Sequence, residues 1–179
     1  MTSFVFNIRK IPVNTGTALY ILLLLTGINS RILAQGKVHD FTLRNTENRA
    51  IHYSELRGEK LTVIDFWATW CQPCIRSLPK LVELSKEYSV EGVNFIGISI
   101  DGPRNQSKVK PFASSLGISY PILMDSSGEL MGELNITSVP TLLVVDRNDR
   151  IVYMHEGFTA GDEETIREEL DRHLQSNKD

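Results

Sequence analysis

The hydrophobic pattern of the chain alternates between short apolar runs, which are typical of strands, and a spacing of three to four residues, which is typical of helices. Residues 61–67 (Leu-Thr-Val-Ile-Asp-Phe-Trp) form a nearly continuous apolar run rich in β-branched and aromatic side chains. Such a run is typical of a central strand that is buried on both faces. Further strands are predicted at residues 40–43, 50–53, 93–100, 120–124, 141–145 and 150–155.

Between these strands, apolar residues recur every three to four positions, as they do on one face of a helix. This spacing predicts a helix over residues 73–88 and a last helix from residue 162 onward. Two shorter helices are predicted at residues 107–116 and 127–134. The order of elements indicates an α/β fold, in which an N-terminal β-hairpin precedes a central mixed sheet with helices on both faces.

The first 34 residues differ in composition from the rest of the chain. Two basic residues precede an apolar stretch from Ala18 to Ile28, which is shorter than the ~20 apolar residues of a membrane-spanning helix. Ala34 then offers a small residue for cleavage. We predict that residues 1–34 are a signal peptide or an N-terminal membrane anchor, with the cleaved signal favoured, and that residues 35–179 form one domain.

The charge of the predicted domain argues against nucleic-acid binding. The chain has 19 basic and 22 acidic residues, and three of the basic ones lie in residues 1–34, which leaves 16 against 22 and a net charge of −6. A nucleic-acid surface needs clustered basic side chains, whereas those of this chain are scattered. With 179 residues, of which 41% are hydrophobic, the chain is long enough for one well-packed domain.

The only two cysteines, Cys71 and Cys74, lie where the predicted central strand gives way to a helix. A helix N-terminus offers unpaired backbone N–H groups and a favourable dipole, and both stabilise an anion. Cys71 is therefore expected to be rich in thiolate, with a pKa below the ~8.5 of a free thiol. Pro73 suits the start of a helix, where its missing N–H is not needed. The pattern predicts that Cys71 attacks a disulfide and that Cys74 resolves the mixed disulfide.

Other uses of the cysteine pair fit the sequence less well. A zinc site needs four ligands, but there is no second cysteine pair and the four histidines are dispersed singly. A purely structural disulfide that closes so short a loop stabilises a protein little. The sequence thus predicts a redox-active dithiol, with no metal site and no cofactor.

The residues around the dithiol resemble a known family. Residues 63–74 are similar to the active-site segment of thioredoxin-like proteins. Four further segments are similar to the exported TlpA/ResA-like branch of that family: Phe41-Thr42-Leu43, Gly97–Asp101, Tyr120-Pro121 and Ser138–Thr141. The match covers roughly residues 38–174 and implies a thioredoxin fold, with residues 101–124 as an inserted helix–strand segment.

The resemblance also implies a substrate-binding surface. Pro140 matches the cis-proline that lies beside the dithiol in the family, and the backbone of Val139 would then pair with an extended substrate segment. From the residues alone, Pro140 could simply begin a strand. Trp70, next to Cys71, is expected to be a partly exposed contact residue, whereas Trp67 is expected to pack in the core.

The third implied role belongs to an acid. Asp65 matches the buried acid beneath the dithiol of thioredoxins, where a raised pKa would let it take the proton from Cys74. Many reductive members of the branch instead carry a glutamate three residues after the second cysteine, and Ser77 stands there in this chain. Asp65 would take over that role, which favours general thiol–disulfide exchange over a dedicated role in cytochrome c maturation.

These observations predict an exported thiol–disulfide oxidoreductase that reduces or exchanges disulfides of other exported proteins. It is expected in the periplasm, either soluble or held at the inner membrane by residues 1–34, with a membrane-bound thiol protein as electron donor. Gln72-Pro73 resembles the Gly-Pro of reducing thioredoxins, which favours reduction. Two alternatives stay open: a peroxiredoxin-like peroxide reductase, whose usual Pro-x-x-x-Thr/Ser-x-x-Cys context does not precede Cys71, and a copper-binding thiol carrier that also uses His155.

Overall fold

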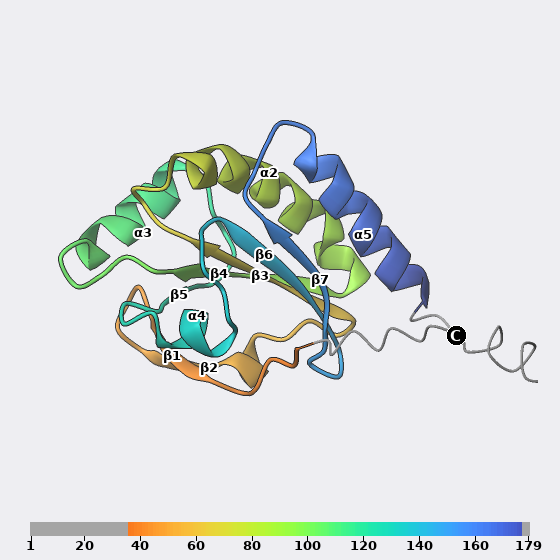
Figure 1. Ribbon diagram of the computed structural model, residues 1–179, viewed down its shortest axis with the longest axis horizontal. Helices are drawn as coiled ribbons and strands as arrows, with labels where there is room; N and C mark the ends of the chain where they lie inside the picture. The colour runs from red at the N-terminus through yellow and green to blue at the C-terminus, as the bar shows by residue number, and fades with distance from the viewer. Residues whose placement is uncertain (1–35, 177–179) are drawn as a thin grey trace, which may run out of the picture. The chain divides into compact units, whose positions relative to one another are not determined.

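The computed structural model describes residues 36–176, which form a seven-stranded mixed sheet (Figure 1). The strands are β1 Thr42–Asn45, β2 Ala50–His52, β3 Leu61–Trp67, β4 Val93–Ser99, β5 Ile122–Met124, β6 Thr141–Asp146 and β7 Ile151–Glu156. They lie side by side in the order β2-β1-β5-β4-β3-β6-β7. The predicted N-terminal hairpin therefore forms one edge of the sheet, and the hairpin of β6 and β7 forms the other.

Strand β3 lies inside the sheet, and all seven of its residues are buried. It pairs in parallel with β4 and antiparallel with β6. Burial on both faces is the reason for its continuous apolar run. In this register Asp65 lies opposite Gly97 of β4 and opposite Leu142 of β6. The one charged residue of β3 is thus held in the interior of the sheet.

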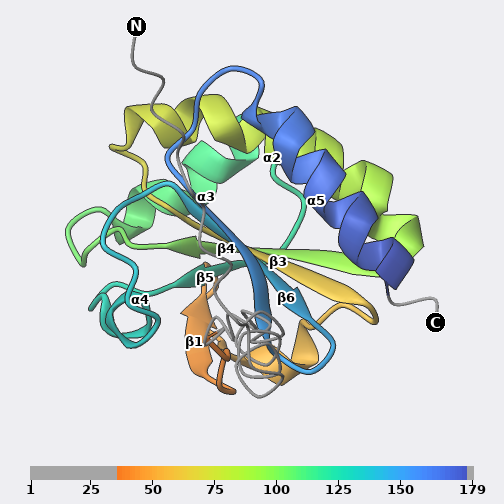
Figure 2. The ribbon, with the colours of Figure 1, turned by 45° about the vertical axis from the view of Figure 1, so that its right-hand side comes forward.

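The sheet is covered by helices α2 Gln72–Tyr88, α3 Gln106–Ser115, α4 Glu129–Glu133 and α5 Asp162–Ser176, and single 3-10 turns lie at η1 Tyr53–Glu55 and η2 Ser89–Glu91. Helices α2, α3 and α5 lie on one face of the sheet, whereas the short α4 lies on the other (Figures 1 and 2). Because side chains alternate along a strand, Val63 packs under α2 and α5, while Ile64 faces the opposite core with Leu130 of α4.

The structure confirms the predicted fold, including the insertion between Asp101 and Met124, which consists of α3 and β5. Two elements are shorter than predicted by more than one residue. Strand β5 starts only after Pro121, because proline has no N–H to donate to a neighbouring strand. Helix α4 starts only after Gly128, whose φ of 72° is left-handed.

The predicted signal peptide or membrane anchor, residues 1–34, lies outside the described residues. Within residues 36–176, no helix is both long enough and apolar enough to cross a membrane.

Candidate active site

The dithiol motif lies at the start of α2. The chain leaves β3 at Trp67 and turns into the helix, whose N-cap residue is Cys71. The Sγ atom of Cys71 accepts a hydrogen bond from the backbone N–H of Cys74, with a distance of 3.2 Å. Pro73 lies in the first turn. Cys71 thus occupies the position where the free N–H groups of a helix stabilise a negative charge.

Cys71 and Cys74 form a disulfide bond, with an S–S distance of 2.07 Å and a Cα–Cα distance of 5.2 Å. Cys71 keeps 4% of its surface exposed, whereas Cys74 is completely buried. A thiolate from another protein can attack only a sulfur that it can reach. The sulfur of Cys71 is therefore the contact point of this disulfide, and Cys74 lies behind it.

The segment before β6 lies beside the disulfide. The peptide bond between Val139 and Pro140 is cis. The carbonyl oxygen of Val139 lies 3.6 Å from the Sγ atom of Cys71. In the disulfide this is a contact and no hydrogen bond, because Cys71 then has no hydrogen to donate; the reduced thiol can donate weakly. Val139 and Pro140 therefore form a wall next to the exposed sulfur.

Asp65 is buried in the sheet beneath α2, with 2% of its surface exposed. Its Oδ2 atom has no hydrogen-bond partner within residues 36–176. Burial disfavours the charged carboxylate and raises the pKa of Asp65 from its ordinary value of 3.8 to about 7. A carboxyl group with such a pKa changes between acid and base near neutral pH.

A small cavity lies next to Asp65, with space for roughly one water molecule. It is lined by Asp65, Ser77, Leu81, Pro140, Leu142, His155, Gly157, Phe158 and Ile166. The hydroxyl of Ser77 donates a hydrogen bond to the carbonyl oxygen of Cys74, with a distance of 3.1 Å. The cavity therefore brings together the buried acid, the cis-proline and the turn of α2 that carries Cys74.

One site residue, Asp101, was not recognised in the sequence. Its carboxylate is completely buried and accepts hydrogen bonds from the backbone N–H of Thr69 at 2.9 Å, from the Thr69 hydroxyl at 2.6 Å and from the Ser99 hydroxyl at 2.9 Å. These bonds fix the turn that leads into Cys71. Asp101 lies two residues after the end of β4, at the same end of the sheet as the last residue of the parallel strand β3, and this register was the signal that could have revealed it.

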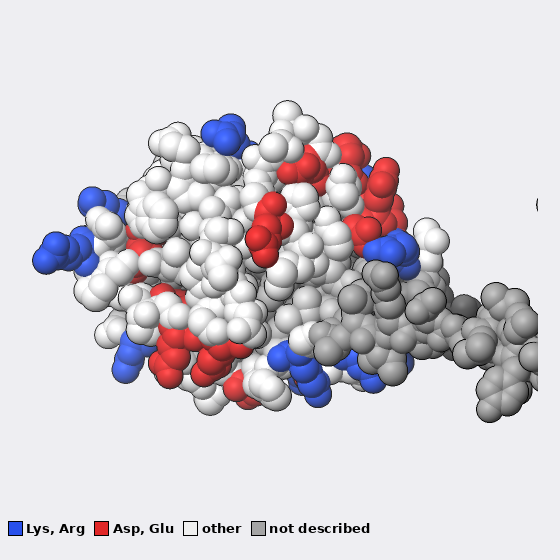
Figure 3. Space-filling model, viewed as in Figure 1, with Lys and Arg blue, Asp and Glu red and all other residues white. Residues whose placement is uncertain are grey.

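The two tryptophans lie in different environments. Trp70 is 58% exposed next to Cys71, whereas Trp67 is completely buried and its ring stacks on Phe112 of α3. The surface around the start of β6 carries few charges, and acidic side chains gather over α5 instead (Figure 3). The residue next to Cys71 in the chain therefore carries an exposed aromatic ring.

His155 was the candidate third ligand of a copper site. In the structure its Nδ1 atom lies 3.0 Å from the hydroxyl of Tyr153, and its Nε2 atom lies 3.1 Å from a carboxylate oxygen of Asp162. Both ring nitrogens are thus engaged, on the face of the sheet that α5 covers. Among the residues that the structure describes, no group of three His, Cys, Asp or Glu side chains is arranged to hold a metal ion.

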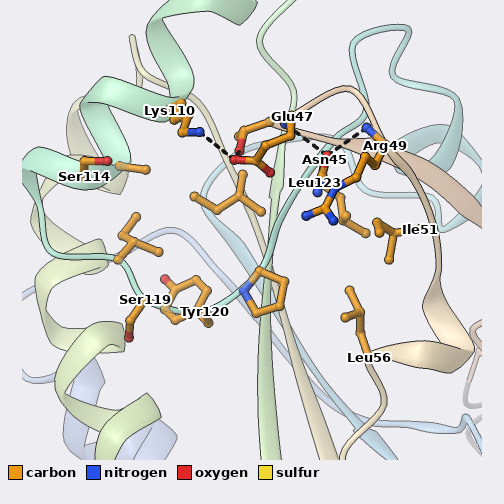
Figure 4. Close-up of a pocket in the computed structure, with 15 residues that line it drawn as sticks. Asn45, Glu47, Arg49, Ile51, Leu56, Lys110, Ser114, Ser119, Tyr120 and Leu123 are labelled. Atoms are coloured by element: carbon orange, nitrogen blue, oxygen red, sulfur yellow. Dashed lines mark hydrogen bonds and ion pairs between the residues drawn. The ribbon is translucent and has the colours of Figure 1, made fainter.

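A separate pocket of about 440 Å³ lies between the N-terminal hairpin and α3. Figure 4 shows the ion pair of Lys110 with Glu47 at its rim, where the two side chains are 2.7 Å apart. Tyr120 and Leu123 contribute to its apolar part. Neither cysteine lines this pocket, so it is distinct from the site around the disulfide.

The fold and the cysteine pair define a thioredoxin-like thiol–disulfide oxidoreductase. The chain belongs to the AhpC/TSA family, whose sequence profile matches residues 34–154. It is 30% identical over 139 residues to the thiol-disulfide oxidoreductase ResA of Geobacillus kaustophilus, an alignment that covers 78% of this chain and 75% of the relative.

Solved structures agree with this assignment. A thioredoxin-like protein from Porphyromonas gingivalis is 34% identical, with a TM-score of 0.66 over 77% of this chain and 92% of the other. A putative thiol:disulfide interchange protein DsbE from Chlorobium tepidum shares the fold, with a TM-score of 0.71, 24% identity, and coverage of 78% of this chain and 96% of that protein. The predicted resemblance to the TlpA/ResA-like branch is therefore confirmed.

Proposed function

We propose that the chain reduces disulfide bonds in other exported proteins, with Cys71 as the nucleophile and Cys74 as the resolving thiol. The observation that carries the proposal is the position of Cys71, which caps α2 and is the more accessible member of the pair, with 4% of its surface exposed against none for Cys74. The N-terminal segment 1–34 supports export, and a membrane-bound thiol protein would return the disulfide to the dithiol form. General exchange is favoured over cytochrome c maturation because Ser77 replaces the acid typical of that role.

The reaction transfers two electrons from the dithiol to the substrate. The Cys71 thiolate attacks one sulfur of the substrate disulfide and forms a mixed disulfide with it. The substrate S–S bond breaks, and the other substrate sulfur leaves and takes up a proton. Cys74 then loses its proton and attacks the Cys71 sulfur of the mixed disulfide. The substrate sulfur that was bound to Cys71 leaves and is protonated, and the Cys71–Cys74 disulfide remains. A second dithiol, that of the electron donor, reverses these steps on this chain.

Asp65 is the proposed acceptor of the Cys74 proton. Three observations support this role: Asp65 is buried, burial raises its pKa to about 7, and it lines one cavity with Ser77, which lies one turn after Cys74 on α2. At neutral pH about half of such groups are ionised and able to accept a proton. The cavity has space for roughly one water molecule, which would lie between Asp65 and Ser77 of the α2 turn that carries Cys74.

The proposed substrate surface consists of Trp70, Val139 and Pro140. The carbonyl oxygen of Val139 lies beside the Cys71 sulfur, where the backbone of an extended substrate segment can pair with it. Trp70 offers a large exposed ring next to the same sulfur. The surface around the start of β6 carries few charges (Figure 3), which suits recognition through the backbone of varied polypeptides.

The two alternative functions have less support. A peroxide reductase needs its reactive cysteine in a context that the residues before Cys71 do not match. A copper carrier would need a third ligand, and both ring nitrogens of His155 are already engaged by Tyr153 and Asp162. Peroxide consumption by the reduced protein, measured beside insulin reduction, separates the first alternative from disulfide exchange.

Replacing Cys74 by serine tests the proposal. The Cys74→Ser variant lacks the resolving thiol, so we expect it to hold substrates as mixed disulfides on Cys71. Non-reducing gels and mass spectrometry of an exported-protein extract measure the captured partners. The matched Cys71→Ser variant should capture at least tenfold less, because Cys74 is buried. Equal capture by both variants, or none by either, would reject the proposed roles.

A further inference from the structure

Three buried polar groups on the α2 face of the sheet have no partner within residues 36–176. They are the Oδ2 atom of Asp65, the indole Nε1 of Trp67 and the hydroxyl of Tyr120. An unpaired polar group in the interior costs about 1–3 kcal/mol, so such groups are rare unless they have a use. The ionised carboxylate of Asp65 accepts hydrogen bonds, whereas the indole of Trp67 and the hydroxyl of Tyr120 donate them. The acid and the two donors can therefore satisfy one another.

Gly97 shows that these groups lie close to one another. It pairs with Asp65 across β3 and β4, so the two residues face the same side of the sheet with Cα atoms about 4.8 Å apart. A Cβ atom on Gly97 would lie 3.0 Å from Nε1 of Trp67 and 3.3 Å from Cε2 of Tyr120. The Cε2 atom is bonded to the carbon that carries the hydroxyl. Both donor side chains therefore fill the space next to the Asp65 carboxyl group.

Tyr120 is held in this position from two sides. Its ring lies beside Phe95, with the ring centres 6.0 Å apart, and the residue also lines the pocket between the hairpin and α3 (Figure 4). Its hydroxyl, in contrast, is buried. Burial, and after it the negative charge of Asp65, raises the pKa of Tyr120 well above its ordinary value. The hydroxyl therefore keeps its proton and acts as a donor throughout the working pH range.

We propose that Tyr120 is a positioning residue for Asp65, whose ionised carboxylate receives hydrogen bonds from the Tyr120 hydroxyl and the Trp67 indole, directly or through one internal water. The proposal rests on the proposed function, because it matters only if Asp65 ionises during the cycle. With these donors, the carboxylate is available to take the Cys74 proton at neutral pH. Without them, a buried charge has no partner and forms less readily.

The other groups packed around Asp65 do not offer this support. Gly97 of β4, Leu142 of β6 and Ile166 of α5 carry no titratable group. The titratable residue that lines the cavity with Asp65 is His155 of β7. The ring nitrogens of His155 are held by Tyr153 and Asp162, which leaves the unpartnered groups of Tyr120 and Trp67 as the candidate donors for Asp65.

The first test is a titration of Asp65 in the oxidised protein without any substrate. Tyr120→Phe removes only the hydroxyl, and ¹³C NMR follows the Asp65 carboxyl group, which is assigned with Asp65→Asn. Loss of a hydrogen bond to the carboxylate should raise the midpoint of the titration by about one pH unit. The control Tyr53→Phe removes a tyrosine hydroxyl that is buried on the opposite face and should leave the midpoint unchanged. An unchanged midpoint in Tyr120→Phe would overturn the proposal.

The second test measures the resolving step of a single turnover as a function of pH. In Tyr120→Phe the rate should fall about tenfold at pH 6 and equal that of the unchanged protein above pH 9, where Asp65 is ionised in both. A uniform loss at every pH would indicate a structural role of Tyr120 and overturn the proposal. If the unchanged protein fails to resolve mixed disulfides at all, the proposed function is wrong. The titration would still show whether the Tyr120 hydroxyl stabilises the Asp65 carboxylate.

Discussion

Asp65 of β3 and Ser77 of α2 face the same small cavity, although they come from different elements of the fold. Ser77 occupies the position at which many reductive relatives carry the glutamate, and its hydroxyl bonds to the carbonyl oxygen of Cys74. The strand therefore supplies the acid at a place where the helix could also supply one. We therefore expect that the acid can be moved from the strand to the helix without moving the dithiol.

The first prediction concerns the proton acceptor. Asp65→Asn removes the base but keeps the size of the side chain, so the resolving step should slow about 10²-fold at pH 7. Rapid mixing with a model disulfide, followed by mass spectrometry of the mixed disulfide, measures this step. Formation of the mixed disulfide by Cys71 should change less than threefold, because it needs no proton transfer to Asp65. An unchanged resolving rate would remove Asp65 from the mechanism.

The second prediction follows from the shared cavity. Adding Ser77→Glu to Asp65→Asn returns a carboxyl group to the cavity from the helix side. The double variant should therefore resolve mixed disulfides about tenfold faster than Asp65→Asn alone. Ser77→Gln in the same background has almost the same size but no basic group. It is the matched control and should recover nothing. Equal rates in the two double variants would show that volume, and not the acid, determines the rate.

The third prediction links Asp65 to stability. Its pKa in the folded chain, about 7, lies above the ordinary 3.8, so between these values the folded state binds the proton more tightly than the unfolded state. Stability is therefore fully present below pH 3.8 and falls as the pH rises toward 7, by about 4 kcal/mol in total. Asp65→Asn should lose this dependence and be the more stable form at pH 8. Urea unfolding of the oxidised proteins at pH 4.5, 6 and 8 tests the difference.

The sequence predicted the elements of the fold and the dithiol because both depend on local patterns. The apolar run of β3 and the helix after Cys71 could be recognised from spacing alone, and the cis bond before Pro140 and the buried acid followed from the family resemblance. Asp101 and Tyr120 were missed as site residues. Their roles arise only when β4 and the segment before β5 are placed beside β3, and such contacts between distant segments leave no periodic signal in the chain.

The fourth prediction concerns Asp101, whose buried carboxylate fixes the turn before Cys71. Asp101→Ala leaves the donors of Thr69 and Ser99 unpaired, and the domain should lose about 3 kcal/mol of stability. The loosened turn should also raise the pH at which Cys71 becomes alkylated by iodoacetamide. Asp125→Ala is the control, because Asp125 is equally buried but accepts its bonds from the backbone of α4. It should destabilise the domain and leave the alkylation profile unchanged; a shift in both variants would contradict a specific role of Asp101.

The fifth prediction concerns Gly97, which leaves room for Trp67 and Tyr120 beside Asp65. Gly97→Ala would place its Cβ 3.0 Å from Nε1 of Trp67 and 3.3 Å from Cε2 of Tyr120, so both rings must shift. Such overpacking should cost about 1–3 kcal/mol of stability. Gly102→Ala is the matched control, because its Cβ would meet no atom within 4 Å, and it should change stability by no more than about 0.5 kcal/mol. Urea unfolding measures both variants. Equal stability of the two would mean that the space above Gly97 is not closely packed, and that the donors beside Asp65 are free to move.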